Sequence, residues 1–334
     1  MRKVVECVPN FSEGRDAGKI EQITAEVQKV PGVKLLDVAS DAHHNRTVLT
    51  FVGEPQPVKK AAYDAIARAA AIIDMARHKG QHPRLGACDV CPFVPIQNVT
   101  MADCVALANE LAREVGEKLH IPVFLYEEAA RSPERRNMAT MRAGEYEGLE
   151  EKLKHSRWKP DHGPAVFNTK SGATVIGARK FLIAYNVYLS TADKEIAHKI
   201  AGIIRESGRI ATADGGQRIR IPGIFRSVKA MGISPEGPGI AEVSTNLTNY
   251  KVAPMHLVFE KIKQLAELAG AGVLCSEIVG LVLKEAVLET GRFYQPRARS
   301  EKKLIEAAVK NLRLNSLRRF DPGEKIIEYL IDGP

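Results

Sequence analysis

The sequence predicts an α/β (α+β) protein of two subdomains, each a βαββαβ-like sandwich of helices on a mixed or antiparallel sheet. Three observations favour this fold class. The chain has 334 residues, more than a typical domain of about 100–150 residues. The order strand, helix, strand, strand, helix, strand occurs once in each half. Hydrophobic residues make up 45% of the chain, which is enough apolar side chain to build two packed cores.

The first half contains five predicted strands and three long predicted helices. Short apolar or alternating runs predict strands at residues 4–8, 33–38, 47–52, 90–96 and 123–126. Apolar residues at helical spacing predict helices at residues 17–30, 57–76 and 102–119. A loop is expected at 78–89, and a charged segment, 127–160, is expected to be helical in pieces. We expect residues 163–180 to link the two halves.

The second half repeats the pattern with four strands and two helices. Strands are predicted at residues 181–189, 227–232, 240–247 and 273–283, the last either staying extended or passing into a helix. Helices are predicted at 193–206 and 254–268. These elements divide the chain into an N-terminal subdomain (1–180), a C-terminal subdomain (181–300) and a helical tail (301–334).

The tail has apolar side chains on one face of a predicted helix and Lys and Arg on the other. The apolar positions are Leu304, Ile305, Ala308, Val309 and Leu312. This pattern predicts a surface helix that docks on the core. An amphipathic helix for a membrane or a partner is the alternative, but the aromatic residues that a membrane helix favours are missing from this face.

Composition and charge exclude several classes of protein. Five cysteines are too few and odd in number for a disulfide scaffold, which fits a reducing compartment. There is no run of about 18 apolar residues and no secretion signal, so we expect a cytoplasmic protein without a membrane segment. The formal charge of +8 favours an anionic partner. A small polyanionic ligand fits better than nucleic acid, because Arg-rich segments interleaved with aromatic residues are missing.

The loop at 78–89 is the strongest candidate for chemistry. It places His78 and His82 among cations, and Gly80, Pro83 and Gly86 interrupt regular structure around them. A histidine here can exchange a proton near neutral pH, and neighbouring cations would lower its pKa and keep it neutral. The alternative is a solvated loop whose histidine caps the preceding helix.

Two other groups of residues are weaker candidates. Cys88 and Cys91 match the C-x-x-C pattern but fall at the start of a strand, so buried apolar cysteines are favoured over a redox or zinc site. The loop at 41–46 carries adjacent histidines, which indicate either a metal or substrate site or simple exposed polarity. Asn45 and Arg46 precede a strand, where they are well placed to bind a carboxylate. The motifs G-x-S-x-G and H-E-x-x-H are missing, which gives serine hydrolysis and zinc proteolysis no support.

Several motifs, in order along the chain, resemble those of the glutamate formimidoyltransferases, the family that also forms the N-terminal half of the formimidoyltransferase–cyclodeaminases. The first half carries ECVPNFSEGR at 6–15, NRT at 45–47, HPRLGA at 82–87, DVCPF at 89–93, LYEEAA at 125–130 and RAGEY at 142–146. The second group comprises GAT at 172–174, GARKFL at 177–182 and VSTNL at 243–247. The resemblance extends through about residue 290. Because no cyclodeaminase domain follows residue 334, a stand-alone enzyme is expected.

The resemblance implies a two-subdomain transferase with folate in a groove between the subdomains. It places the family's catalytic histidine on His82. Its folate-binding stretch falls on Gly163, Pro164, Ala165, Val166, Phe167, Asn168, Thr169, Lys170, Ser171 and Gly172. Where members often carry an acid, this chain has Ala39, and Asp41 is the nearby candidate to replace it. Arg46 and Arg84 are expected to bind substrate carboxylates, and Asn10 to hydrogen-bond substrate or loop.

The implied reaction moves a formimidoyl group from N-formimidoyl-L-glutamate to N5 of tetrahydrofolate, in histidine degradation and one-carbon metabolism. His82 would act as general base and then as general acid. Tetrahydrofolate, including its polyglutamylated forms, is the expected co-substrate, without a metal ion, and a homodimer is expected from the exposed strand edges. The alternatives are a glutamate formyltransferase that makes 5-formyltetrahydrofolate, a non-catalytic folate-binding protein, and an RNA-binding protein.

Overall fold

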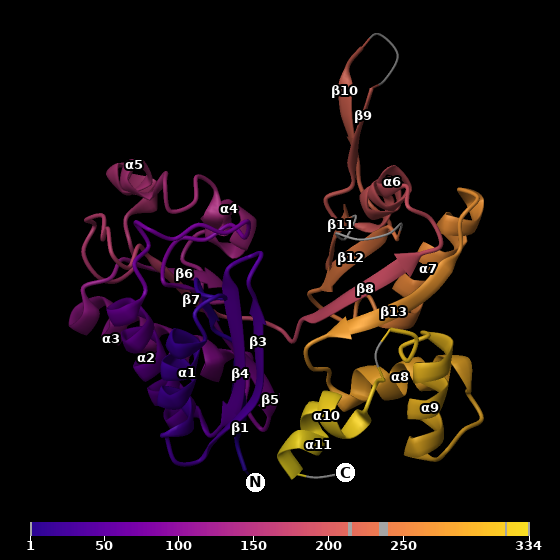
Figure 1. Cartoon of the computed structure of the whole chain (residues 1–334), viewed down its shortest axis with the longest axis horizontal. Helices are drawn as coiled ribbons and strands as arrows, with labels where there is room; N and C mark the ends of the chain where they lie inside the picture. The colour runs from indigo at the N-terminus through magenta and orange to yellow at the C-terminus, as the bar shows by residue number, and fades with distance from the viewer. Residues whose placement is uncertain (1, 213–215, 234–239, 318, 333–334) are drawn as a thin grey trace. The chain divides into compact units, whose positions relative to one another are not determined.

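Two main sheets organise the chain, one in each of two compact units, Met1–Lys180 and Phe181–Pro334 (Figure 1). The structure is a computed structural model, and it describes residues 2–212, 216–233, 240–317 and 319–332. Helices cover sheets of mixed or antiparallel strands in both units. The predicted fold class is therefore confirmed.

The first unit is built on a seven-stranded mixed sheet. Its strands are β1 (Val4–Cys7), β2 (Asn10–Phe11), β3 (Val33–Asp41), β4 (Arg46–Gly53), β5 (Cys88–Gln97), β6 (Val123–Glu127) and β7 (Thr174–Ala178). The strands β3, β4, β1 and β5 pair antiparallel in that order, whereas β7 lies between β5 and β6 and pairs parallel with both. The short β2 pairs with β4 and β5.

The second unit repeats the same core topology with a four-stranded antiparallel sheet. Its strands are β8 (Ile183–Leu189), β11 (Val228–Ile233), β12 (Glu242–Leu247) and β13 (Val273–Val279), in the order β11-β12-β8-β13. In chain order these strands are the second, third, first and fourth, which is also the order of β3, β4, β1 and β5 in the first unit. The predicted βαββαβ arrangement is thus present in each half.

Three helices cover one face of the first sheet: α1 (Ala17–Gln28), α2 (Pro55–Ile72) and α3 (Met101–Leu119) (Figure 1). Local sequence explains their ends. The Asp16 side chain accepts a hydrogen bond from the backbone of Lys19 at the start of α1, and Thr100 and Asp103 form a capping box on α3. Pro55 stands in the first turn of α2, where its missing N–H costs nothing.

The opposite face of this sheet is covered, at strands β5, β6 and β7, by the charged segment that follows β6. As predicted, the segment is helical in pieces, with α4 (Met138–Arg142) and α5 (Leu149–Lys154) between short 3-10 turns. Met141, Leu149 and Leu153 pack there against Phe124 and Trp158, whose rings meet edge to face at 6.4 Å. This second core fixes the loop between α4 and α5 beside the loop that carries His82.

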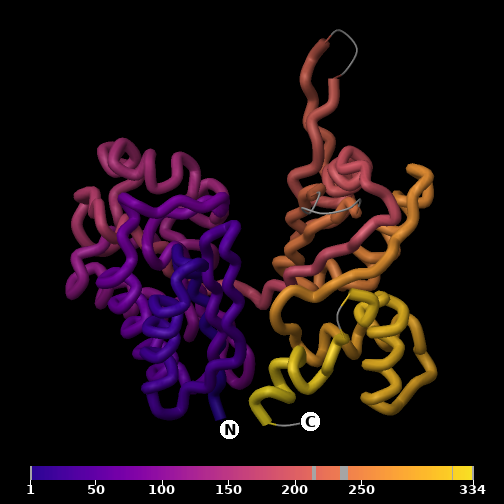
Figure 2. The backbone as a smooth tube through the Cα atoms, viewed as in Figure 1, coloured from indigo at the N-terminus to yellow at the C-terminus, as the bar shows by residue number. Residues whose placement is uncertain are grey.

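One prediction of a connecting segment was wrong, and three short strands were not predicted. Residues 163–180 do not only link the halves, because β7 is an internal strand of the first sheet. Its five residues are all buried, so the alternation that marks a half-buried strand is lacking. The prediction also lacked β2 and the hairpin of β9 (Arg209–Thr212) and β10 (Arg218–Ile221), which projects from the sheet of its own unit (Figure 2).

The helices of the second unit are α6 (Lys194–Ile204), α7 (Met255–Leu268), α8 (Lys284–Tyr294) and α9 (Glu301–Asn311), followed by the short α10 (Pro322–Lys325) and α11 (Ile327–Asp332). Leu304, Ile305 and Ala308 of α9 are buried, and the Leu304 carbonyl lies so close to Gly291 of α8 that a Cβ there would meet it at 2.2 Å. The predicted docking of the tail helix is confirmed. No helix in the described part of the chain is long and apolar enough to cross a membrane.

Candidate active site

The loop between α2 and β5 carries His82, and four other segments of the first unit contact it. They are the turn after β2, the β3–β4 hairpin, the α4–α5 loop and the segment before β7. The hydrogen bonds between them involve residues 10–16, 41–47, 78–89, 142–147 and 168–173. Segments far apart in the sequence therefore meet around one histidine.

The imidazole of His82 contacts Arg46, and Arg46 contacts Asn10. Nη1 of Arg46 lies 2.9 Å from Nε2 of His82 and 3.1 Å from Oδ1 of Asn10. A guanidinium only donates hydrogen bonds, so Nε2 must be the acceptor and carries no proton. The amide of Asn10 is fixed from its other end, because Nδ2 donates to the carbonyl of Val8 at 3.0 Å. Three of the predicted site residues, Asn10, Arg46 and His82, thus form a continuous chain of contacts.

Burial and positive charge hold His82 in its neutral form. Desolvation is the largest cause, and Arg46, Arg142 and His44 add repulsion, so that the pKa of His82 falls to about 3. The same effects act on Arg46, whose pKa is lowered by burial and by Arg142. The imidazole is therefore a proton acceptor at neutral pH, although a weak one while these cations surround it.

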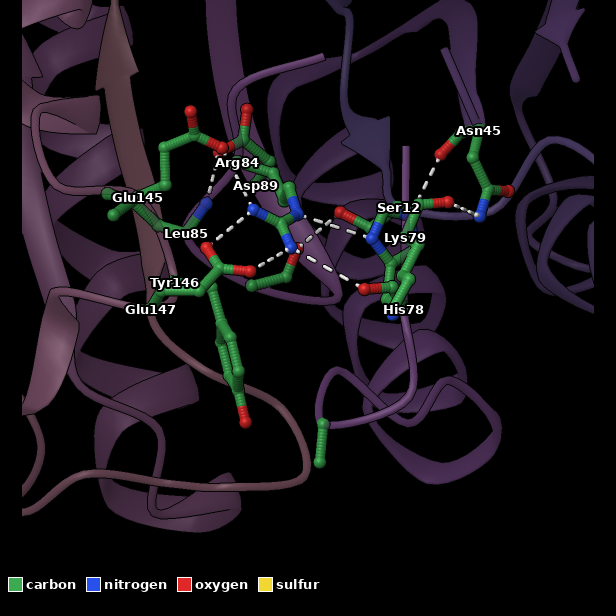
Figure 3. Close-up of polar contacts among 12 residues, drawn as sticks. Ser12, Asn45, His78, Lys79, Arg84, Leu85, Asp89, Glu145, Tyr146 and Glu147 are labelled. Carbon is green, nitrogen blue, oxygen red and sulfur yellow. Dashed lines mark hydrogen bonds and ion pairs between the residues drawn. The ribbon is translucent and has the colours of Figure 1, made fainter. Parts of the chain in front are cut away.

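Asn45 connects three of the converging segments rather than facing open space (Figure 3). Its Oδ1 accepts from the backbone N–H of Gly14 at 2.9 Å, and its Nδ2 donates to the carbonyl of Lys79 at 3.0 Å. Its own carbonyl lies 3.1 Å from Nε2 of His78. The residue is buried and adopts a φ of 49°, a conformation that Asn tolerates better than most residues. Both ends of its amide are occupied by backbone groups.

The guanidinium of Arg84 is held by two carboxylates of the α4–α5 loop (Figure 3). Nη1 lies 2.8 Å from Glu145 Oε2 and 2.8 Å from Glu147 Oε2, and Nη2 lies 2.6 Å from Glu147 Oε1. Nε donates to Nδ1 of His78 at 3.2 Å. These acids raise the pKa of Arg84 further, with Glu147 as the largest cause. A cleft of about 510 Å³ opens at this point, lined by Lys79, Gly80, Arg84, Gly144, Glu145 and Glu147.

Asp89 and Arg142 form a second ion pair beneath the same loop. Asp89 is buried, and its Oδ1 accepts from the backbone N–H of Leu85 at 2.9 Å (Figure 3). Its Oδ2 accepts from Nε of Arg142 at 3.0 Å and also contacts Nη2 of that residue. The pair fixes the C-terminal part of the loop and brings the positive charge of Arg142 into the surroundings of His82.

The stretch expected to bind folate runs beside the same loop. Val166 is 67% exposed, and Phe167 is half-buried with its ring centroid 5.2 Å from that of Tyr146. Asn168, Thr169, Lys170 and Ser171 mostly contact the protein itself, because they bond the backbone or the side chains of residues 70–75, 87 and 146. Pro164 is half-buried and Ala165 is exposed.

The glycines at the two ends of this stretch are required by close backbone packing. A Cβ on Gly163, which has a φ of +78°, would meet the Ile121 carbonyl at 2.2 Å. A Cβ on Gly172, at φ +67°, would meet the Leu85 carbonyl at 2.1 Å. Gly172 forms a backbone bridge with Gly86, which joins the end of the stretch to the loop of His82.

The carboxylate of Asp41 is paired with His44. Its Oδ1 accepts from the backbone N–H of His44 at 2.8 Å, and its Oδ2 lies 2.9 Å from Nδ1 of the same histidine. The pKa of Asp41 is lowered, chiefly by the first of these hydrogen bonds. The imidazole of His82 contacts the cation Arg46 instead. The sequence analysis expected a carboxylate as the partner of this histidine.

The cysteines are all buried and free. Cys88 and Cys91 lie in β5, and the sulfur of Cys91 is 3.5 Å from that of Cys7. Burial raises the pKa of Cys7 and Cys88 well above the ordinary thiol value. The prediction of buried apolar cysteines is confirmed. Among the described residues, no group of three or more His, Cys, Asp and Glu side chains is arranged to hold a metal ion.

Sequence reasoning missed four residues of this arrangement: Ser12, Arg142, Glu145 and Glu147. Ser12 donates from Oγ to the carbonyl of Gly86 at 2.8 Å. The other three belong to the motif RAGEY and the residue after it, so the resemblance marked the segment without assigning it a role. Only the tertiary structure brings this loop to Arg84 and Asp89.

Comparisons with known proteins agree with this architecture. Residues 4–179 match the family model "Formiminotransferase domain, N-terminal subdomain", and residues 184–332 match "Formiminotransferase domain". The chain is 43% identical over 294 residues to a glutamate formimidoyltransferase of Streptococcus pyogenes serotype M1, covering 88% of this chain and 94% of the relative. It is 45% identical over 293 residues to one of Thermoplasma acidophilum, covering 87% and 92%.

A longer relative matches over nearly the whole chain. The formimidoyltransferase-cyclodeaminase of Gallus gallus is 46% identical over 335 residues, covering 99% of this chain and 60% of the relative. The chain thus spans about three fifths of the length of the relatives of this kind that it matches, at 60–61%. Since the two family models account for residues 4–179 and 184–332, this chain belongs to the formiminotransferase domain family.

Proposed function

We propose that this protein transfers the formimidoyl group of N-formimidoyl-L-glutamate to N5 of tetrahydrofolate. The two glutamate formimidoyltransferases that align with this chain over most of their own length support this activity. The observation on which the mechanism depends is the unprotonated Nε2 of His82, half-buried among cations on the loop that also carries three residues lining the cleft, Lys79, Gly80 and Arg84. A neutral imidazole in such a place is suited to exchange a proton with a bound substrate.

In this mechanism His82 moves one proton between two nitrogens. A bond forms between N5 of the folate and the amidine carbon, and His82 accepts the proton that N5 then loses. The bond between that carbon and the glutamate nitrogen breaks, and His82 returns the proton to the departing nitrogen. A general acid–base in this position contributes about 10²–10⁴-fold to the rate. One imidazole accepts the proton and later returns it, so the mechanism requires no cysteine nucleophile.

The residues around His82 fit both substrates. Each substrate carries glutamyl carboxylates, and Arg46, Arg142 and Lys79 supply positive charge in this part of the first unit. The exposed Val166 and the half-buried Phe167 offer apolar surface for a flat aromatic ring. When bound, tetrahydrofolate supplies the accepting amine, and the chain supplies orientation and proton transfer.

We propose that the enzyme acts in histidine degradation in the cytoplasm and that it is a homodimer. We further propose a working division into subdomains 1–180 and 181–300 with a tail from 301. Light scattering coupled to size-exclusion chromatography measures the dimer directly.

The experiment that tests the function is a turnover assay with two donors side by side. Purified protein is incubated with tetrahydrofolate and either N-formimidoyl-L-glutamate or N-formyl-L-glutamate, and the folate product is identified by its absorbance and mass. We expect turnover with the formimidoyl donor. Turnover only with the formyl donor would indicate a glutamate formyltransferase. Saturable folate binding without turnover of either donor would indicate a binding protein.

A further inference from the structure

The contacts of Arg46 differ from those of three other arginines near or beneath the same sheet, Arg84, Arg135 and Arg142. Arg84, Arg135 and Arg142 each contact a protein carboxylate, on Glu147, Asp161 and Asp89 respectively. The hydrogen-bond partners of Arg46 are instead the amide oxygen of Asn10 and the imidazole of His82, which are both neutral. A half-buried guanidinium with neutral partners retains its affinity for a carboxylate.

The same contact occupies the atom that the mechanism needs. Nε2 of His82 has one lone pair, and Nη1 of Arg46 donates to it at 2.9 Å. While that hydrogen bond is present, Nε2 cannot accept a proton from a substrate amine. If Nε2 were protonated, two donors would face each other. The contact with Arg46 must therefore break before His82 acts as a base through this atom.

We propose that Arg46 is the residue that couples donor binding to the basicity of His82: a carboxylate of the glutamate donor takes over the guanidinium of Arg46, which leaves Nε2 of His82 free to accept a proton. This inference deepens the proposed function and rests on it. Asn10 retains Arg46 through Oδ1 during the exchange, because its own amide is fixed by Val8. The chemical class recognised is a carboxylate on a small amino-acid donor.

The other charged groups around His82 do not replace Arg46 in this role. Arg142 on α4 is already paired with Asp89, and His44 on the β3–β4 hairpin is paired with Asp41. Both add repulsion at a distance, whereas Arg46 is in contact. Removal of the direct donor and addition of a negative carboxylate act in the same direction, and each favours the protonated imidazole. Donor binding thus strengthens the base when a substrate is present to be deprotonated.

The test is an NMR titration of His82 in the full chain with ¹⁵N-labelled histidine. The His82 signals are identified by their loss in His82→Gln. Titrations are recorded without ligand and with saturating N-acetyl-L-glutamate, which has the carboxylates of the donor but no transferable formimidoyl group. The neutral diamide of N-acetyl-L-glutamate serves as the ligand control, and Arg226→Gln, an exposed arginine of the second unit, as the protein control.

We expect the ligand to raise the midpoint of the His82 titration by about one pH unit or more. In Arg46→Gln, we expect the midpoint to be raised already without ligand and to respond no further to it. The diamide and Arg226→Gln should leave the wild-type behaviour unchanged. In steady-state assays, Arg46→Gln should raise KM for the glutamate donor about tenfold or more, and Arg46→Lys should not restore the ligand-dependent shift.

Two outcomes would overturn the inference in distinguishable ways. Saturable binding of N-acetyl-L-glutamate with an unmoved His82 midpoint, or a midpoint in Arg46→Gln equal to that of the wild type, overturns the coupling and leaves the transferase function intact. A lack of saturable binding, together with a lack of formimidoyl transfer by the wild-type protein, overturns the proposed function and the coupling with it.

Discussion

Arg84 and Glu147 face each other through two parallel hydrogen bonds, with Nη1 2.8 Å from Oε2 and Nη2 2.6 Å from Oε1. The side chain of Arg84 is 7% exposed, whereas that of Glu147 is 65% exposed. The buried Arg84 thus connects the loop of His82 to the exposed edge of the neighbouring α4–α5 loop. The sequence reasoning assigned Arg84 to a substrate carboxylate. In this structure Glu145 and Glu147 occupy its guanidinium.

Arg84→Lys should destabilise the protein although it keeps the charge. Lysine cannot form the two-pronged contact or the hydrogen bond to His78, so we expect a loss of about 1–2 kcal/mol in the free energy of unfolding, measured in urea. The matched control is Arg292→Lys, whose pair with Glu285 is exposed on both sides and should change stability by less than about 0.5 kcal/mol. Equal effects of the two substitutions would show that the contact is not structural.

His82→Gln should fold like the wild type and lose at least about tenfold in kcat for formimidoyl transfer. Glutamine is similar in size and can still accept the hydrogen bond from Arg46, but it cannot carry a proton between nitrogens. His198→Gln is the control, because His198 is exposed on α6 in the second unit. Wild-type turnover by His82→Gln, with an unchanged far-UV spectrum, would remove His82 from the mechanism.

Asn45→Ala should destabilise the first unit more than Asn98→Ala. Both residues have a left-handed φ, 49° and 52°, so the backbone cost of the substitution is similar. Asn45 is buried and bonds two backbone groups, whereas Asn98 is exposed and donates to the carbonyl of Arg2. We expect an additional loss of about 1–3 kcal/mol for Asn45→Ala in chemical denaturation. Similar losses in both variants would contradict its structural role.

The thiols should be unreactive in the native protein. All five cysteines are buried, and burial raises the pKa of Cys104 to about 12. We expect Ellman's reagent to modify less than about one thiol per chain in buffer and all five after denaturation. Rapid modification of Cys88 or Cys91 in the folded protein, located by peptide mass, would revive the C-x-x-C interpretation.

The sequence predicted the fold where periodicity is local and strong. The alternation in β8 and the apolar stripe of α3 were sufficient, because each element buries one face. It failed at β7, which is buried on both faces and carries no periodicity. It also failed at β9 and β10, whose residues are mostly exposed, so that no apolar pattern marks them.

The candidate site was predictable only where its residues are local in the sequence. The motif around His82 was visible because it is contiguous in sequence, and Asn10 and Arg46 could be singled out as polar residues beside strands. The contact of Arg46 with His82 spans 36 residues, and that of Arg84 with Glu147 spans 63. Such pairings are decided by sheet order and by the packing of the α4–α5 loop, which a single sequence does not contain.

His82 should make the folded state more sensitive to acid. Its pKa is about 3 in the folded protein and 6.5 for an unperturbed histidine, so between these pH values the unfolded chain binds a proton that the folded chain rejects. The free energy of unfolding therefore falls as the pH drops below 6.5. In His82→Gln this contribution is missing. The free energy of unfolding measured in urea should therefore fall less steeply from about pH 6 to about pH 4. His198→Gln, at an exposed position of α6, is the control substitution. Parallel curves for the wild type and His82→Gln would mean that the imidazole is not held neutral by Arg46 and its surroundings.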